Sequence, residues 1–295
     1  MKKIEDLYDI YLMQNNIIYS IDKIRLKTYI SYDKYSNLDF YLRTYHNDKI
    51  DYYKISDRIM QFKYNYSIKV GEGQSFYLGF HHNNEKHDEH DGLYNLTVEF
   101  NPNKLKKDRL LMYILNLSGQ WYLKRYDLAM DLQVNILDLI TDLSGKYKQK
   151  VFSNGFDDKT IYFGVGDGHV KIYNKKIESK LDIIGNLTRV EITREVEDFE
   201  IRKVKALNYD NNFPSIYTNN YMFSFSDYTD KTLLPILYAI QNGYPIRDLT
   251  KTYRKKIRDL LEGGYKIKFD NKTVTDLLRR VIFHYFMENN LVVWW

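Results

Sequence analysis

The stretch WYLKRYDLAMDLQV, Trp121–Val134, alternates between polar and apolar side chains along most of its length. Successive side chains of a strand face opposite ways, so the alternation defines two faces. One face carries Arg125, Asp127, Ala129 and Asp131. The other carries Tyr126, Leu128, Met130 and Leu132. The pattern predicts a half-buried strand whose polar face holds two aspartates, a residue that strands disfavour.

Segments on both sides of this strand alternate in the same way. Ile21–Ile30 predicts a strand whose outer face is basic through Lys23, Arg25 and Lys27. Further strands are expected at residues 62–70, 75–80, 94–100, 158–164, 169–175 and 187–195. Helices are expected at residues 103–119, 135–146, 231–243, 245–264 and 274–290. This order predicts an α+β fold, in which helices pack on one face of a mainly antiparallel sheet. We place a boundary near residue 205, between a domain of residues 1–205 and a smaller helical region of residues 206–295.

Composition limits the function classes. The chain has 295 residues, no cysteine and a net charge of +5, so it has neither disulfides nor thiolate metal sites, and its charge only weakly favours an anionic partner. No apolar run reaches the roughly 18 residues of a membrane span, and we find no signal peptide, so a cytoplasmic location without membrane contact is expected. The 29 tyrosines are explained by AT-rich codons or by selection for stacking on bases.

Three predicted strands offer a polar face each. These faces carry Arg125, Asp127 and Asp131, then His169, Lys171 and Tyr173, then Arg189, Glu191 and Thr193. If the strands are neighbours in register, carboxylates face a tyrosine, and such carboxylates bind Mg²⁺ or Mn²⁺. A tyrosine beside that cation is a candidate nucleophile toward phosphorus. An ordinary sheet with one face in water shows the same alternation, and this alternative stays open.

The motifs of these strands resemble the Rep_trans family of rolling-circle plasmid replication initiators. The resemblance is carried by RYDLAMD at residues 125–131, HVKIYNKKIE at 169–178 and TRVEITRE at 188–195. It extends over about residues 18–200. It implies an endonuclease that nicks one strand at a replication origin, becomes linked to the 5′-phosphate through tyrosine, leaves a 3′-OH for a host polymerase, and later closes the strand.

The resemblance also implies roles for individual residues. Tyr173 would be the nucleophile, with Tyr162 as the second candidate. The divalent cation would be held by Asp127, Asp131 and Glu191. Phosphate contacts, or support of the carboxylates, would come from Arg125, Lys175 and Arg189. The implied partners are origin DNA, a host helicase and polymerase, and a second copy of the chain.

Two departures from the family pattern keep other functions open. Asn174 stands where the family has aspartate, and Lys171 where it has arginine, which loses the bidentate fork of a guanidinium. A DNA-binding replication factor or regulator without cleavage activity, a conjugative relaxase of the same family, and a phage structural protein are the alternatives.

Two other segments were weighed as binding sites. A helix within residues 245–264 carries Lys251, Arg254, Lys255 and Arg258, which would meet DNA phosphates or form a solvated face. The loop of residues 81–91 is rich in histidine and acidic residues. We interpret this loop as solvated, because it lacks the fixed ligand spacing of a zinc site.

Overall fold

The structure is a computed structural model that describes residues 7–52, 61–71, 74–84, 88–105, 108–142, 149–153, 159–163, 169–208, 213–218, 231–241, 244–262 and 266–286. Its strands are β1 (Tyr11–Gln14), β2 (Ile17–Ile30), β3 (Ile50–Tyr52), β4 (Phe62–Gly71), β5 (Gln74–His82), β6 (Glu89–His90), β7 (Leu93–Phe100), β8 (Tyr122–Leu132), β9 (Leu139–Asp142), β10 (Gln149–Ser153), β11 (Lys159–Phe163), β12 (Val170–Asn174), β13 (Thr188–Glu200) and β14 (Ser215–Thr218). Its helices are α1 (Tyr32–Tyr45), α3 (Arg109–Leu115), α4 (Lys175–Glu178), α5 (Leu234–Gln241), α6 (Lys251–Glu262) and α7 (Asn271–Phe286). Short 3₁₀ helices are η2 (Asn47–Lys49), η3 (Ile136–Asp138), η4 (Ile201–Ala206), η6 (Lys231–Leu233) and η7 (Ile246–Asp248).

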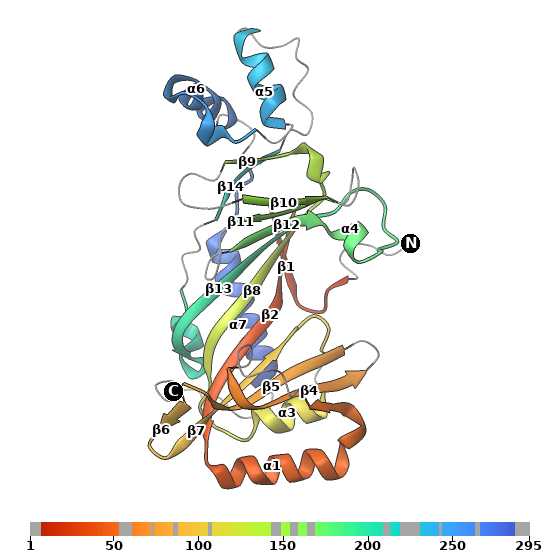
Figure 1. The fold of residues 1–295 in the computed structure, drawn as a ribbon, viewed down its shortest axis with the longest axis vertical. Helices are drawn as coiled ribbons and strands as arrows, with labels where there is room; N and C mark the ends of the chain where they lie inside the picture. The colour runs from red at the N-terminus through yellow and green to blue at the C-terminus, as the bar shows by residue number, and fades with distance from the viewer. Residues whose placement is uncertain are drawn as a thin grey trace.

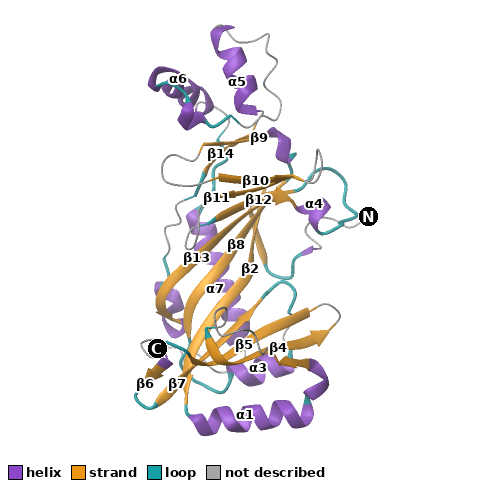
Figure 2. Ribbon diagram, in the orientation of Figure 1, coloured by secondary structure: helices purple, strands orange, loops and turns teal. Residues whose placement is uncertain are grey.

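One antiparallel sheet dominates the fold (Figures 1 and 2). Among the described residues it contains twelve strands in the order β10-β11-β12-β13-β8-β2-β7-β5-β4-β3, with β1 beside β2 and β6 beside β7. The long strands β2, β8 and β13 cross the middle of the molecule, and α7 runs behind them (Figure 1). The predicted α+β class is confirmed.

The register of the sheet aligns the polar faces that the sequence predicted. Asp131 on β8 lies opposite Arg189 on β13, and Arg189 lies opposite Tyr173 on β12. Residues directly opposite each other in antiparallel strands point to the same face. The polar sets of three neighbouring strands therefore share one face of the sheet.

The opposite face forms the main core. Leu128 on β8, Ile192 on β13 and Ile21 on β2 are fully or almost fully excluded from solvent. They belong to the same apolar cluster as Leu277 and Leu278 of α7. Each such side chain contributes about 1.5–3 kcal/mol by burial, so this face holds α7 against the sheet.

A second, smaller core lies around α5, α6 and the two-stranded sheet of β9 and β14. It includes Ile140 of β9, Tyr217 of β14 and Ile257 of α6. The division near residue 205 stays a prediction. The two cores do not separate at residue 205. Strand β9 lies before residue 205 and contributes to the second core, whereas α7 lies after residue 205 and packs in the main core.

Two helix predictions were inaccurate in ways that local contacts explain. The helix expected at residues 135–146 is wrong: Asn135 caps only η3, and the chain then continues as β9, which pairs with β14. Pairing with a distant strand overrides the local pattern here. The helix expected from residue 103 begins after Asp108, whose side chain accepts hydrogen bonds from the first amides of α3. None of the helices in the described ranges combines the length and apolar character that a membrane span needs.

Candidate functional site

Tyr173 lies at the end of β12, directly before α4. Asn174 forms the N-cap of α4, and its side chain accepts a hydrogen bond from the amide of Ile177. The Tyr173 hydroxyl donates a hydrogen bond to Glu191 Oε2 at 3.2 Å. The ammonium group of Lys171 lies 3.9 Å from the centre of the Tyr173 ring, so a cation covers the ring next to the carboxylate.

Arg189 is the centre of a buried polar cluster beside Tyr173. Its Nε and Nη2 each donate to Asp131 at 2.8 Å, which makes a bidentate pair with both side chains almost completely buried. Nη1 donates to Asp22 at 3.2 Å, and Nη2 also donates to the Tyr8 hydroxyl at 3.2 Å. The Tyr8 hydroxyl donates to Asp131. Charge-assisted bonds of this kind hold the guanidinium in one orientation.

Asp127 lies two rows further along the same face, beyond the row of Ala129 and Glu191. It accepts a hydrogen bond from Thr193 Oγ1 at 2.9 Å and one from Arg125 Nε at 3.2 Å. Asp127 is 4 % exposed, so its charge is offset by Arg125 rather than by water. The predicted neighbourhood of Arg125, Asp127 and Thr193 is therefore present.

The carboxylates of this face differ in their freedom to bind a cation. Both oxygens of Asp131 already accept bonds from Arg189. Within the described part of the chain Glu191 forms no hydrogen bond or ion pair with a guanidinium, and the charges of Asp22 and Asp127 act on it. No group of three or more histidines and carboxylates with metal-binding geometry occurs in the described residues. Both oxygens of Asp127 likewise accept bonds from Arg125. Mg²⁺ often takes only one or two protein carboxylates and keeps several waters, so Glu191 fits such a cation chemically, whereas Asp127 and Asp131 fit an orienting role.

Burial shapes the ionisation of the two central groups. Burial raises the pKa of Tyr173 far above its ordinary value; Arg189 opposes this rise and the charge of Glu191 adds to it. Burial also raises the pKa of Glu191, and the nearby Asp22 charge adds to the effect. Glu191 is thereby a better proton acceptor than an exposed glutamate.

We predict that Glu191→Gln raises the melting temperature at neutral pH. The folded protein binds the Glu191 proton more tightly than the unfolded chain, so this group favours folding below about pH 4.5, and the contribution is lost as the pH rises through the raised pKa. Glutamine is neutral at every pH. The variant should therefore be more stable than wild type only at pH values above about 4.5, where the glutamate loses its proton. Thermal unfolding between pH 4 and pH 8 measures it, with the exposed Glu197→Gln on the same strand as control. A difference between wild type and Glu191→Gln that is the same at every pH would contradict the prediction.

The remaining predicted site residues lie around this cluster. Lys175 lies 5.7 Å from the centre of the Tyr173 ring and pairs with Glu178 at 2.9 Å. Tyr162 lies opposite Lys171 in the register, and its ring packs on Phe152. The Tyr173 hydroxyl, by contrast, bonds to a carboxylate of the cluster.

The basic helix α6 lies in the other core, away from the strands that carry Tyr173 (Figure 1). Lys251 and Lys255 are exposed. Arg254 donates to the carbonyl oxygens of Arg247 and Leu249, and Arg258 is partly buried. The structure therefore does not bring this helix and the tyrosine cluster together into one site.

The histidine-rich segment forms a local contact of its own. The ring of His81 bonds to the carboxylate of Asp88, which also accepts from the amide of His82 at 2.6 Å. His90 is exposed, and His87 lies outside the described residues. The described residues of this segment form no group of three ligands that could hold a metal ion, and the bonds of Asp88 to His81 and His82 account for its burial.

Two residues of the cluster were not found from the sequence. Asp22 falls on the apolar side if β2 alternates regularly, but the register shifts between Ile21 and Lys23, and Asp22 contacts Arg189. Bulges of this kind re-aim a side chain, and alternation cannot reveal them. Tyr8 is 123 residues from Asp131 in sequence, so no local signal marks their contact.

Comparison with known proteins shows which proteins the chain is similar to. Over 95 residues, 29 % of this chain, the sequence is 37 % identical to a replication initiation protein of Staphylococcus aureus, and the match covers 29 % of that protein. A second replication initiation protein of Staphylococcus aureus is 36 % identical over 112 residues, which is 33 % of this chain and 35 % of that protein. No family model matches.

Among solved structures, the chain is similar to the rolling circle replication initiator protein from Geobacillus stearothermophilus, with a TM-score of 0.39 and 14 % identity over 83 % of this chain and 97 % of that chain. The chain is thus similar to replication initiation proteins, which confirms the resemblance drawn from the strand motifs. The sequence match spans only about a third of the length of these curated relatives.

Proposed function

We propose that the chain is a replication initiation protein that nicks one DNA strand and rejoins it through Tyr173. The observation that carries this proposal is the hydrogen bond of 3.2 Å from the Tyr173 hydroxyl to Glu191, with Lys171 over the same ring. A phenol, a proton acceptor and a cation then meet at one point of a sheet. The similarity to replication initiation proteins of Staphylococcus aureus supports DNA as the substrate.

The proposed step transfers a phosphoryl group. The Tyr173 oxygen attacks the scissile phosphorus, and its proton passes to Glu191. A bond forms between the tyrosine and the 5′-phosphate, while the bond from phosphorus to the 3′-oxygen breaks. The leaving 3′-oxygen takes a proton and becomes the 3′-OH that a host polymerase would extend. Reversal of the same exchange rejoins the strand.

Charge on the phosphate would be offset by side chains of this chain. Lys171 and Lys175 lie beside the Tyr173 ring, and Tyr173 is only 3 % exposed in the free protein. Both ammonium groups would therefore have to move to admit the phosphate, and they would then offset its charge. Arg189 is held by Asp131 and would keep the surrounding strands in place. Glu191, through the carboxylate oxygen that does not accept from Tyr173, is the residue that would hold Mg²⁺ or Mn²⁺, a cation that supplies polarisation of the phosphodiester when bound.

Other contacts with DNA would lie outside the cluster. The cations of α6 would bind phosphates and give affinity without sequence information. A host helicase, a host polymerase and a second copy of the chain are the further partners that the resemblance implies, and they belong to this proposal.

The test is intact mass spectrometry of the protein after incubation with Mn²⁺ and single-stranded oligonucleotides that tile its own gene and flanking DNA. We expect a mass increase equal to a DNA fragment, which also locates the nick site. Excess EDTA should prevent the adduct while part of the DNA binding remains. Full adduct formation in EDTA would remove the cation from the proposal.

A DNA-binding replication factor that does not cleave is the second candidate. The burial of Tyr173 favours it, because a nucleophile must reach its substrate. Salt-dependent binding without any mass shift would support this candidate and overturn cleavage.

A further inference from the structure

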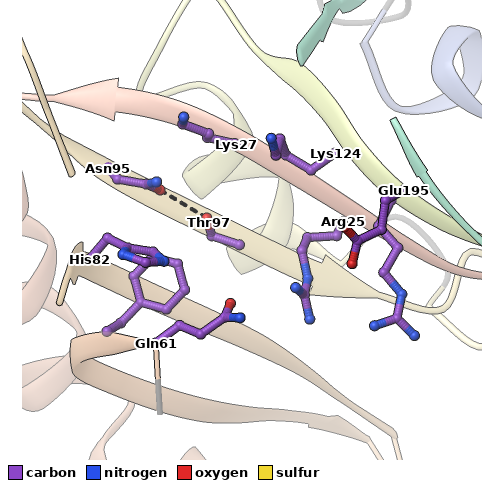
Figure 3. A pocket seen from close by; sticks show the side chains of 10 residues that line it. Arg25, Lys27, Gln61, His82, Asn95, Thr97, Lys124 and Glu195 are labelled. Carbon is purple, nitrogen blue, oxygen red and sulfur yellow. Dashed lines mark hydrogen bonds between the residues drawn. The ribbon is translucent and has the colours of Figure 1, made fainter. Parts of the chain in front are cut away.

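A cavity of about 250 Å³ opens on the same polar face, beyond Arg125 (Figure 3). It is lined by Arg25, Lys27, Gln61, Phe62, His82, Asn95, Thr97, Lys124, Arg125 and Glu195. Arg125 also donates to Asp127, so the cavity adjoins the tyrosine cluster. Glu195 and Glu191 are four residues apart on β13, which at 3.3 Å per residue is about 13 Å. A short segment of single-stranded DNA could therefore contact both places.

The wall of the cavity combines buried polar groups with aromatic rings. Asn95 and Thr97 are 3 % and 4 % exposed, and the Thr97 hydroxyl donates to Asn95 Oδ1 at 2.9 Å. Figure 3 shows Asn95 above His82, and Thr97 beside it toward Arg25. The rings of Phe62 and His82 meet edge to face with centroids 5.0 Å apart. Amide and guanidinium groups read the edges of bases, and aromatic rings stack on unpaired bases.

The charges around the cavity argue against a phosphate as its occupant. Arg25 pairs with Glu99 at 2.7 Å, and Arg125 pairs with Asp127 at 3.2 Å. Lys27 and Lys124 both pair with Asp198, at 3.6 and 2.8 Å. An anion would have to replace these carboxylates, whereas a neutral group with donors and acceptors would not.

Size favours a small occupant. Sites for drug-sized ligands measure about 300–1,000 Å³, and this cavity falls just below that range. A single nucleobase is small enough, and its edge carries both donors and acceptors.

We propose that this cavity binds one unpaired base of the DNA strand that Tyr173 acts on. The inference rests on the proposed function, because it takes the bound strand as the source of the base. The cavity would fix the register of the strand and so choose which phosphate reaches Tyr173. Base contacts specify sequence, whereas phosphate contacts position the backbone.

The test combines abasic oligonucleotides with a cavity variant. Equilibrium binding is measured by fluorescence anisotropy for oligonucleotides that carry one abasic position at a time around the nick site. We expect one position at which loss of the base weakens binding to wild type about tenfold, the size of one stacked base. In His82→Ala, the intact oligonucleotide should bind about tenfold more weakly, and the abasic substitution should cost nothing further.

Controls keep the test independent of the nicking chemistry. His90→Ala changes an exposed histidine outside the cavity and should keep the full abasic penalty. Gln61→Ala, at an exposed lining residue, replaces His82→Ala if that variant does not fold. The base-binding proposal is overturned if the abasic penalty persists in the cavity variant, or if no position shows a penalty. In either case a covalent adduct would still support the proposed function.

Three further outcomes also decide whether the cavity binds a base of the strand. Binding without an adduct, but with the expected coupling between His82 and one base, keeps the pocket and rejects cleavage. Absence of DNA binding rejects both proposals. If free nucleoside monophosphates displace the oligonucleotide efficiently, the cavity binds a free nucleotide. That result would overturn the proposal that it binds a base of the DNA strand.

Discussion

Tyr173→Phe is expected to abolish the covalent protein–DNA adduct and leave oligonucleotide affinity nearly unchanged. The substitution removes only the hydroxyl that donates to Glu191 and keeps the ring that Lys171 covers. Without the phenolic oxygen no phosphotyrosine bond can form, so the loss should be complete rather than partial. Intact mass measures the adduct, and anisotropy measures the affinity.

Tyr162→Phe is the matched control for this experiment. Tyr162 is on the neighbouring strand, and its ring packs on Phe152 rather than near Glu191. We expect this variant to form the adduct as wild type does. An adduct that survives in Tyr173→Phe and disappears in Tyr162→Phe would transfer the nucleophile to Tyr162.

Arg189→Met is expected to lower the free energy of unfolding by about 3–5 kcal/mol, the usual cost of breaking a buried ion pair. Arg189 is 2 % exposed and Asp131 1 % exposed, so the variant leaves a carboxylate in the core without its guanidinium. Stabilities of small domains are about 5–15 kcal/mol, so this loss is a large fraction of the total. Urea denaturation gives the change.

The double variant Arg189→Met, Asp131→Leu separates the unpaired charge from lost packing. Apolar replacement of both partners of a buried pair is often close to neutral, so the double variant should regain much of the stability. Arg43→Ala removes an exposed pair with Asp39 on α1 and should cost about 0.3–0.5 kcal/mol. Equal losses in Arg189→Met and Arg43→Ala would show that the buried cluster does not stabilise the fold.

Much of the sheet could be predicted from the sequence, because its strands are long and alternate. The period of two places Arg125, Asp127 and Asp131 on one face regardless of what the strand pairs with. Tyr173 and Glu191 follow from the same rule on β12 and β13. The three polar faces form one surface because β12, β13 and β8 are adjacent in the sheet. Alternation does not predict which strands are adjacent, and the motif resemblance was the only sequence signal for it.

The rest depended on contacts that no local pattern carries. Asp22 reaches Arg189 through an irregularity of β2, and Tyr8 reaches Asp131 across 123 residues. The helix α1 was missed although Ser31 accepts a hydrogen bond from the amide of Lys34 as its N-cap, because its aromatic and polar residues show no clear apolar face. The cavity beyond Arg125 exists because Gln61 and His82 lie close to Arg125 in the folded chain, and only the tertiary structure determines this.

The bond between Arg189 and Tyr8 joins residues 181 positions apart, and this has a consequence for biosynthesis. A ribosome adds residues from the N-terminus, so Tyr8, Asp22 and Asp131 all emerge before Arg189 exists. Contacts of such long sequence separation form slowly, after much of the chain has become available. A nascent chain that stops before Arg189 therefore holds Tyr8, Asp22 and Asp131 without the guanidinium that joins them. Interrupted translation would leave fragments in which this buried cluster cannot form.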